Sequence, residues 1–410
     1  MDDWVLENLS IAEAASRKGL CDRCLGRLFG KLGTGMTNDQ RGRIIRESLT
    51  LNGISSSAPD ICGLCDDVFD SLDIFADAAA ASILSVESDN FLIGSRVDPE
   101  IAAKEKALWE ELGAENAEPL KTELNREIGK LALPKIHRAV EFKNPQVVAC
   151  VDTQFADVTL DVAPIFIYGR YNKLSREIPQ TIWPCRVCKG KGCQRCKGVG
   201  KMYNTSVQEI IGDIAIDMSG GKEHFLHGMG REDIDALMLG TGRPFVLEIS
   251  SPRIRDINLD DLEKRSNGSD LAKFNSLRFT TRDAVQRTKD LAPTKTYKVR
   301  VKVNGKVNKE RVNEVAQSFR NLCIDQRTPA RVEHRRADLV RKREVLWVEA
   351  DWIDEGTFDL TLETESGTYV KEFVSGDDGR SRPNFSEALG MQCRVETLDV
   401  LAINDHEVIR

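Results

Sequence analysis

Some segments of the chain repeat hydrophobic residues at helical spacing and others alternate them as strands do. Together the two patterns predict a protein of mixed α and β structure (α/β, of the α+β type). Residues 67–86 and the Glu-rich residues 105–133 have the spacing typical of helices. Residues 90–97 predict a strand, and clustered, alternating apolar residues over 147–174 predict a strand pair. We therefore expect an α/β accessory domain over residues 1–180.

The second half of the chain shows the same mixture of helical and strand periods. Apolar residues recur at helical spacing over 207–218, where Ser206 and Glu209 form a capping-box pattern. Residues 308–319 predict a further helix between strands. Three segments alternate apolar and polar residues as half-buried strands do: 243–249, 297–303 and 358–364. We expect residues 204–410 to form a second α/β domain around a mixed, largely antiparallel sheet.

Charge is distributed unevenly along the chain. The 410 residues include 58 Lys and Arg against 65 Asp and Glu, which gives a net charge of −7. Yet residues 165–203 hold nine basic residues and one acid, and residues 291–345 hold fifteen and six. Two basic segments in an acidic chain indicate a local site for a polyanion, although a solvated lysine face would give the same pattern.

Neither a membrane anchor nor an export signal is visible in the sequence. No stretch approaches the ~18 to 20 apolar residues that a membrane-spanning helix needs. Residues 1–10 lack the basic and apolar regions of a signal peptide. We therefore expect a cytoplasmic protein without a membrane partner.

Eight of the eleven cysteines fall into four CxxC pairs, which predict metal sites. The pairs are Cys21/Cys24, Cys62/Cys65, Cys185/Cys188 and Cys193/Cys196. The last two pairs lie in tandem CxxCxGxG units, where glycines allow the backbone to turn so that four thiolates converge on one ion. The first two pairs are separated by 37 residues and need an intervening helix to bring them together. We expect one or two structural Zn²⁺ sites without an open position for a catalytic water, and a zinc knuckle over residues 181–203.

One loop carries groups suited to acid, base or nucleophilic chemistry. Residues 230–245 place carboxylates and arginines between glycines, directly before a strand. A surface salt-bridge loop is the alternative interpretation of this segment. Residues 219–222 match only the start of a pyrophosphate-binding loop, and no other cofactor-binding motif is evident, so we expect no organic cofactor.

Several segments of the chain resemble one family of RNA-modifying enzymes. Residues 230–249, GREDIDALMLGTGRPFVLEI, resemble the motif that carries the catalytic aspartate in the archaeal and eukaryotic tRNA pseudouridine synthases that modify uridines 54 and 55 of the T loop. Three further segments agree with this family in the same order: KTYKVRVKV at 295–303, QRTPARVEHRRADLVRKREV at 326–345 and SGTYVKEFVSGDDGRSRPNFSEALG at 366–390. Residues 165–185 resemble the end of the family's THUMP-containing accessory region, and the tandem CxxCxGxG knuckle resembles that of archaeal members.

The resemblance implies an isomerase that breaks the N1–C1′ bond of uridine, turns the base and rejoins it through C5. It places the catalytic carboxylate at Asp233, with Asp235 as the rival position. The carboxylate would either attack C1′ or take the C2′ proton to form a glycal. Lys371 would be the cation that keeps this carboxylate ionised, and Arg231 would contact the substrate.

The resemblance also implies tRNA as the partner. Target uridines lie inside a folded loop, so the base must be extruded; Tyr297 would then stack on it, with Tyr369 on the other side. Seven residues would line a groove for tRNA phosphates: Arg331, His334, Arg335, Arg336, Arg341, Lys342 and Arg343. No obligate protein partner is expected.

The sequence therefore predicts a stand-alone tRNA pseudouridine synthase of archaeal type. It would comprise a zinc-containing, THUMP-like domain that binds tRNA over residues 1–180, the knuckle over 181–203 and the catalytic domain over 204–410. One alternative is a non-catalytic zinc-containing tRNA-binding protein. Another is a THUMP-linked methyltransferase or thiouridine synthase, which the missing cofactor loops argue against. Whether one or both uridines are modified stays open.

Overall fold

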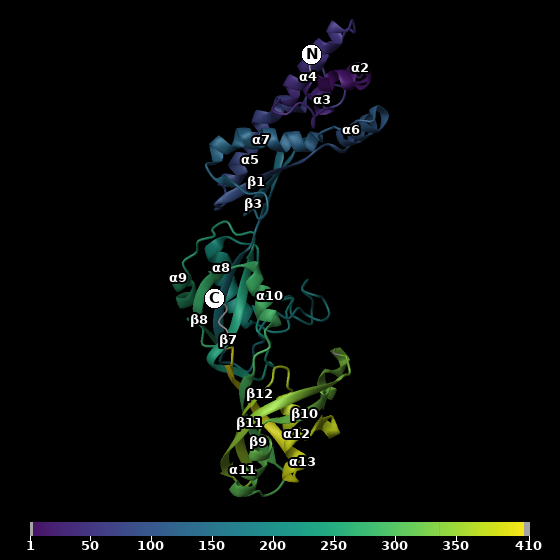
Figure 1. Ribbon diagram of the computed structural model, residues 1–410. Helices are drawn as coiled ribbons and strands as arrows, with labels where there is room; N and C mark the ends of the chain where they lie inside the picture. Colours follow the sequence, from purple (N-terminus) through teal and green to yellow (C-terminus); the bar gives the residue numbers. More distant parts are fainter. Residues whose placement is uncertain (1–2, 336, 406–410) are drawn as a thin grey trace. The chain divides into compact units, whose positions relative to one another are not determined.

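The computed structural model describes residues 3–335 and 337–405, without the side chains of residues 334 and 335. Its chain divides into two compact units, Met1–Ala163 and Pro164–Arg410 (Figure 1). Across the described residues, every helix is too short or too polar to span a bilayer.

The division between the units precedes β5 (Ile165–Lys173). This strand is hydrogen-bonded on one side to β7 (Leu237–Ser250) and on the other to β8 (Ala272–Thr280), so it lies inside the sheet of the second unit. The sequence pattern had instead grouped residues 165–173 with the N-terminal region, whose expected end was near residue 180. Strand partners far along the chain decide the place of β5, and alternation within the strand does not reveal them.

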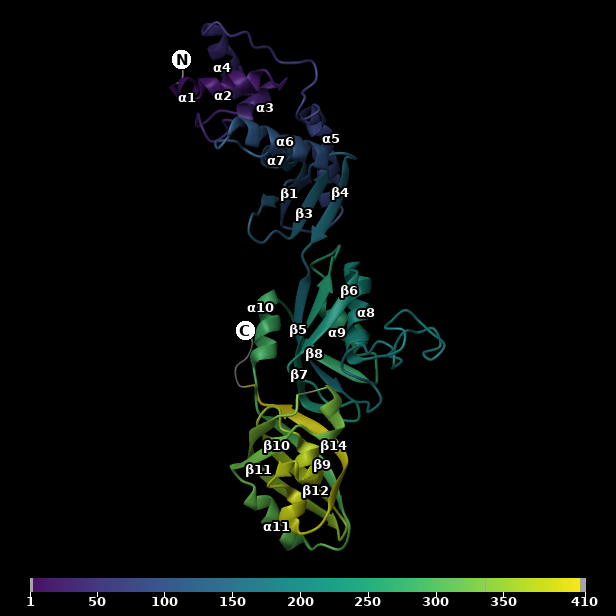
Figure 2. The ribbon, with the colours of Figure 1, turned by 90° about the vertical axis from the view of Figure 1, so that its right-hand side faces the viewer.

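The first unit combines a group of N-terminal helices with a small sheet that two further helices cover. Its helices are α1 (Asp3–Glu7), α2 (Leu9–Ser16), α3 (Asp22–Arg27), α4 (Asn38–Leu51), the 3₁₀ turn η1 (Val68–Ser71), α5 (Leu72–Leu84), α6 (Pro99–Leu112) and α7 (Leu120–Ile136). Its described strands are β1 (Asn90–Arg96), β2 (Ala139–Val140), β3 (Val147–Asp152) and β4 (Asp157–Val162), in the order β2-β1-β3-β4. Helices α5 and α7 lie side by side against β1 and β3 (Figures 1 and 2). The core of this unit runs from the space between that helix pair and the sheet into the packing of the N-terminal helices α1 to α4.

The helix expected over residues 105–133 is two helices, α6 and α7. Gly113 ends α6 in a left-handed conformation, with φ of +62°, which residues with a Cβ adopt only at a cost. Pro119 then stands at the start of α7. The helical period continues through the break, so periodicity alone did not reveal it.

The second unit is built on one large, mixed sheet. Its remaining described strands are β6 (Glu223–Gly228), β9 (Lys295–Val303), β10 (Leu322–Arg327), β11 (Val340–Asp354), β12 (Thr357–Thr364), β13 (Ser381–Arg382) and β14 (Cys393–Ile403). Their order is β13-β10-β11-β12-β9-β14-β7-β5-β8, with β6 on β7. Among these described strands, β14 and β7 form the one parallel pair and all other pairs are antiparallel. The expected mixed, largely antiparallel sheet is confirmed.

Helices cover the sheet of the second unit in two groups. The helices are α8 (Val207–Ser219), α9 (Leu259–Ser266), α10 (Arg282–Asp290), α11 (Lys309–Ser318), α12 (Val370–Ser375) and α13 (Phe385–Leu389). Helix α8 packs on β6, β7 and α9, and α11, α12 and α13 pack together near β11 and β14 (Figure 1). As the sequence predicted, the Ser206 hydroxyl caps α8 by accepting a hydrogen bond from the Glu209 N–H.

Candidate active site

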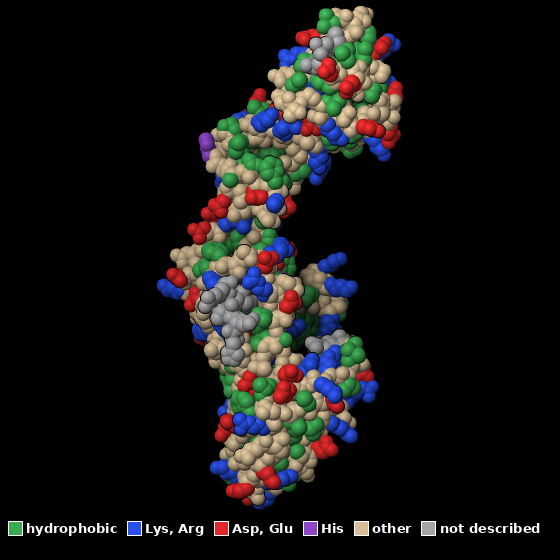
Figure 3. Space-filling model, viewed as in Figure 1, with side chains coloured by type: hydrophobic (Ala, Val, Ile, Leu, Met, Phe, Trp, Pro, Cys, Tyr) green, Lys and Arg blue, Asp and Glu red, His purple; other side chains and the backbone are tan. Residues whose placement is uncertain are grey.

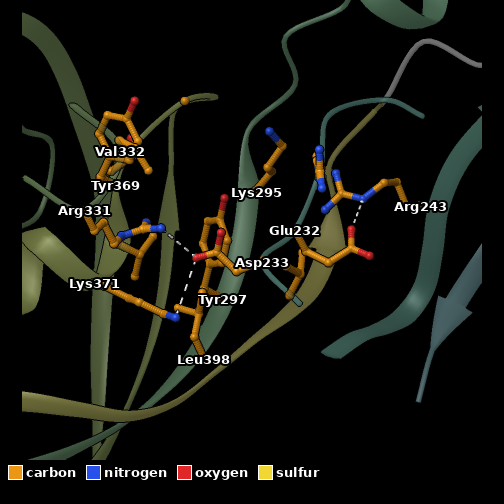
Figure 4. Close-up of a pocket in the computed structure, with 15 residues that line it drawn as sticks. Glu232, Asp233, Arg243, Lys295, Tyr297, Arg331, Val332, Tyr369, Lys371 and Leu398 are labelled. Atoms are coloured by element: carbon orange, nitrogen blue, oxygen red, sulfur yellow. Dashed lines mark hydrogen bonds and ion pairs between the residues drawn. The ribbon is translucent and has the colours of Figure 1, made fainter. Parts of the chain in front are cut away.

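A pocket of about 180 Å³ lies at the neighbouring strands β9, β14 and β7 of the large sheet (Figure 4). It is lined by Arg231, Glu232 and Asp233 from the loop between β6 and β7, Arg243 of β7, Lys295 and Tyr297 of β9, Arg331 and Val332 of the 3₁₀ turn η2 (Ala330–Arg335), Gly367 to Lys371 around the start of α12, and Leu398 and Val400 of β14. The structure thus brings together Asp233, Arg231, Tyr297, Tyr369 and Lys371, which the sequence placed at one site.

The carboxylate of Asp233 lies between two cations. Arg331 Nη1 is 3.1 Å from Asp233 Oδ2, and Lys371 Nζ is 3.6 Å from the same oxygen (Figure 4). Arg331, expected in a phosphate groove, also donates to Glu372 Oε1 at 2.6 Å, so its guanidinium contacts two carboxylates beside the pocket. Two cationic side chains therefore flank the Asp233 carboxylate.

The rival carboxylate, Asp235, lies at the edge of the site. Its side chain is 66% exposed against 35% for Asp233, and it does not line the pocket. It accepts a hydrogen bond from Lys371 at 2.8 Å. Partial burial would raise the pKa of Asp235, but the hydrogen bond and charge of Lys371 outweigh that effect and hold the pKa below its usual value. Lys371 therefore bridges the two aspartates.

Buried side chains hold the loop that carries Asp233. Arg243 Nε donates to Glu232 Oε2 at 2.8 Å, both side chains are 1% exposed, and Arg243 also donates to the Met229 carbonyl. On the other side of the loop, the buried ammonium of Lys173 donates to the Ile234 carbonyl at 2.6 Å. Burial lowers the pKa of Lys173, since its partners are carbonyl dipoles. The conformation of the loop is thus set by interactions on both sides of Asp233.

The two tyrosines enter the pocket from different elements (Figure 4). Tyr297 is 8% exposed, and burial raises its pKa to about 12, so the phenol stays neutral. Tyr369 precedes α12 and is half-buried. The buried amide of Gln326 holds its backbone, accepting from the Tyr369 N–H at 2.8 Å and donating to its carbonyl at 3.0 Å. Aromatic rings on two sides of the pocket can contact a planar base.

Arg231 connects the pocket to the base of the knuckle. Its guanidinium lies 4.8 Å from the ring centre of Trp183, which contacts Tyr203 edge-to-face at 5.6 Å. Trp183 and Tyr203 flank the tandem CxxCxGxG segment, and the Met202 N–H donates to the Trp183 carbonyl. The base of the knuckle therefore contacts Arg231, which also lines the pocket.

The other expected basic residues lie on and before β11. Arg341 donates to Thr328 Oγ1, and the guanidinium of Arg343 lies against Gly367 at the pocket edge. Lys and Arg side chains gather at the lower right of Figure 3, where Figure 1 shows β10, and on the loop between β5 and α8. Arg336 lies outside the described residues, as do the side chains of His334 and Arg335.

The eight paired cysteines form two clusters of four. In each cluster the sulfur atoms all lie within 4.8 Å of one another, so either cluster could hold a metal ion. Cys185 and Cys193 are 3.9 Å apart, and Cys193 and Cys196 are 3.7 Å apart. In the N-terminal cluster the two pairs meet directly, since the Cys21 N–H donates to Cys62 Sγ at 3.3 Å and the Cys21 and Cys65 sulfur atoms are 3.9 Å apart. Between the pairs in sequence, α3 and α4 cross very closely: a Cβ on Gly26 or Gly42 would lie 1.9 Å from a backbone oxygen of the other helix.

Comparison with known proteins shows the family to which this chain belongs. The family model described as "Pus10, C-terminal" matches residues 166–404, and the model "Pus10 THUMP domain, archaeal" matches residues 75–152. The chain belongs to the Pus10 family. A tRNA pseudouridine synthase Pus10 of Pyrococcus furiosus is 40% identical over 94% of this chain and 95% of its own. Proteins of the same name from Methanothrix thermoacetophila and Methanopyrus kandleri are 36% and 37% identical, over 94% and 96% of this chain and 91% and 98% of theirs.

The two matched regions differ in which parts of the pocket and of the cysteine clusters they include. The Pus10 C-terminal region contains every pocket residue and the Cys185–Cys196 cluster. The archaeal Pus10 THUMP region starts within α5 and ends at β3, so the N-terminal cysteine cluster lies before it.

Sequence reasoning missed several residues of this Pus10 site. The contact of Arg331 with Asp233, the support of Lys173 beneath the loop, and Lys295 in the pocket wall were not expected. The alternation of β9 did place residues 295 and 297 on one face, which could have singled out Lys295. Lys173 gave no such signal, because the loop carbonyls that it contacts, those of Asp233 and Ile234, are 60 and 61 positions away in the sequence.

Proposed function

We propose that this protein is a tRNA pseudouridine synthase that isomerises uridine to pseudouridine. The observation that carries the proposal is the carboxylate of Asp233 between Arg331 and Lys371, beside the buried ring of Tyr297 in one pocket. The names of the Pus10 relatives support the same reaction. The alternative of a non-catalytic tRNA-binding protein gives no reason to hold a carboxylate in such a pocket.

The reaction requires one carboxylate and no redox chemistry. Asp233 attacks C1′ as a nucleophile or takes the C2′ proton to form a glycal; either role needs the ionised form. Arg331 and Lys371 place two positive charges beside this carboxylate. Asp235 is the weaker candidate, because its side chain is largely exposed and does not line the pocket.

The pocket suits an extruded base better than a base inside a helix. We assign Tyr297 as the stacking ring, Tyr369 as a contact on the other side, and Arg231 as a substrate contact at the rim. The proposed targets are uridines 54 and 55 of the T loop, as the motif resemblance implies. This activity fits the expected cytoplasmic location.

Basic side chains outside the pocket would hold the tRNA backbone. We assign this role to the segment around β11, with Arg335, Arg336, Arg341 and Arg343, and to the lysines of the knuckle over 181–203. Arg331 joins this group only if it exchanges a carboxylate partner for a phosphate. The N-terminal THUMP-like region is proposed as the accessory tRNA-binding part, and residues 204–410 as the catalytic part.

Zinc is the proposed metal of both cysteine clusters. Thiolates at the corners of a zinc tetrahedron lie ~3.8 Å apart, given a Zn–S distance of ~2.3 Å. The separations of 3.7 to 3.9 Å in the Cys185–Cys196 cluster match this value. Four cysteines fill every coordination position, so each ion would stabilise the fold and not take part in the chemistry.

The test is a comparison of two aspartate variants on unmodified transcribed tRNA. Pseudouridine is mapped by carbodiimide-dependent stops in primer extension, and tRNA affinity is measured in parallel. We expect Asp233→Asn to bind tRNA and yield no stops, whereas Asp235→Asn, its matched control on the same loop, gives stops at T-loop uridines as the wild type does. Tight binding without stops for any of the three proteins would instead support the tRNA-binding alternative.

A further inference from the structure

Lys295 is a buried cation in the pocket wall. It is the first residue of β9 and lies two positions before Tyr297, so both side chains leave the strand on the pocket face. The residue is only 9% exposed. Its ammonium donates one hydrogen bond, to Ser366 Oγ at 3.0 Å.

No acid compensates this charge within the described residues. The neighbours of its ammonium are Ser366, which is neutral, and Arg243, whose own charge is paired with Glu232. Burial, together with the charge of Arg243, lowers the pKa of Lys295 to about 8. A buried ammonium with one neutral partner is unfavourable for folding, since charges lose hydration on burial. Its position inside the pocket suggests that the missing partner comes with the substrate.

The geometry separates Lys295 from the cations around Asp233. In Figure 4, Asp233 and Tyr297 lie between Lys295 and the pair formed by Arg331 and Lys371. Those two cations are already engaged with carboxylates, at 2.6 to 3.6 Å. A base stacked on Tyr297 would therefore have Asp233 on its sugar side and the free donors of Lys295 on another.

We propose that Lys295 is a further catalytic residue, which stabilises the negative charge on the uracil ring after the glycosidic bond breaks. This inference rests on the proposed pseudouridine synthase function. When the N1–C1′ bond breaks, its electron pair stays on the base and is shared with the O2 and O4 carbonyls. In the nucleophilic route C1′ gains a bond to the Asp233 carboxylate; in the glycal route the C2′ proton passes to Asp233.

The rest of the reaction balances without a proton from Lys295. C5 of the turned base forms the new bond to C1′, which releases Asp233 or returns its proton to C2′. The C5 proton is then lost and one proton is taken up at N1, so uridine and pseudouridine have the same composition. Lys295 only donates a hydrogen bond to a uracil carbonyl oxygen, and this interaction is strongest while the ring is anionic. A donor fixed in advance at a place where charge develops is an efficient form of catalysis.

The first test separates catalysis from binding. Single-turnover rates at saturating enzyme, and tRNA dissociation constants, are measured for Lys295→Met and Lys295→Arg. Lys289→Met is the matched control, because Lys289 is an exposed lysine at the end of α10 outside the pocket. We expect Lys295→Met to slow the single-turnover rate by about 10²-fold with little change in tRNA affinity. Lys295→Arg should recover much of the rate, and Lys289→Met should match the wild type.

The second test is a pH profile, which a purely structural role would not change. The groups near the Lys295 ammonium are Arg243 of β7 and Ser366 after β12, and Tyr297 follows on its own strand. Glu232 of the β6–β7 loop also lines the pocket, but it is paired with Arg243. Above its pKa Lys295 is neutral, so the wild-type rate should fall at alkaline pH. Arginine stays protonated there, so the alkaline fall should shift to higher pH in Lys295→Arg.

These outcomes distinguish failure of the inference from failure of the proposed function. A wild type that forms no pseudouridine refutes the proposed function itself. An active wild type with a Lys295→Met rate within twofold of it refutes the role of Lys295 alone. If Lys295→Met does not fold, Lys295→Arg decides the question, since an alkaline limb identical to that of the wild type contradicts the inference.

Discussion

Replacing Arg243 with methionine should strongly destabilise the C-terminal unit, because it leaves Glu232 as a buried charge without its ion-pair partner. Both side chains are 1% exposed, and the Arg243 Nε to Glu232 Oε2 distance is 2.8 Å. The remaining partner of Glu232 is the neutral hydroxyl of Tyr171, at 2.9 to 3.0 Å. Removing one partner of a buried ion pair costs about 3 to 5 kcal/mol. Arg243 also donates to the Met229 carbonyl at 2.7 Å, so we expect a loss near the upper end of that range.

The loss is measured by urea denaturation of the full chain, read out by hydrogen exchange in peptides from β5 and β7. These peptides report on the C-terminal unit separately from the N-terminal one. The matched control is the double variant Glu232→Leu/Arg243→Met, which removes both charges and should recover most of the stability. A loss under about 1 kcal/mol in the single variant, which is typical of surface substitutions, would refute the reasoning. So would a double variant no more stable than the single one.

Two further predictions concern the metal and an ion pair on β12. Cys196→Ser should lose one of the two metal equivalents by elemental analysis and slow pseudouridine formation several-fold, because the knuckle base holds Trp183 against Arg231; full metal content would contradict this. Asp359→Asn should lower the urea midpoint at pH 7, because the hydrogen bonds from Arg300 hold the pKa of Asp359 below its usual value. Asp359 stabilises the folded state fully above its unfolded pKa of about 3.9, and this stabilisation is lost as the pH falls through its lower pKa in the folded state. The urea midpoints of the wild type and of Asp359→Asn should therefore converge in acid.

The sequence predicted local structure well where the signal is itself local. The start of α8 follows from the Ser206 cap, and the apolar face of β9 follows from alternation. Strand pairing was harder to predict from the sequence. We expected β5 to belong with β3 and β4, but it pairs with β7 and β8, which lie more than 60 residues later. Which strand lies beside another depends on the burial of a whole face, and each strand alone is compatible with several partners.

The same limit applied to the candidate site. Asp233, Tyr297, Tyr369 and Lys371 could be assigned because short motifs mark them, and the structure places all four in one pocket. The contact of Arg331 with Asp233 joins residues 98 positions apart, and no pattern within either segment encodes it. Arg331 was expected at a phosphate groove because a run of basic residues indicates only that charge is concentrated there, and not which anion each residue meets.

The distribution of cations around the pocket suggests how one carboxylate can serve the whole reaction. Arg331 and Lys371 lie beside Asp233, where charge is present before the glycosidic bond breaks. Lys295 lies elsewhere in the wall, where we infer that charge appears afterwards on the base. Glu232 neutralises Arg243, so that this fourth cation stabilises the loop without competing for the substrate. Because separate elements hold these charges in place, the site can favour both charge distributions without rearranging.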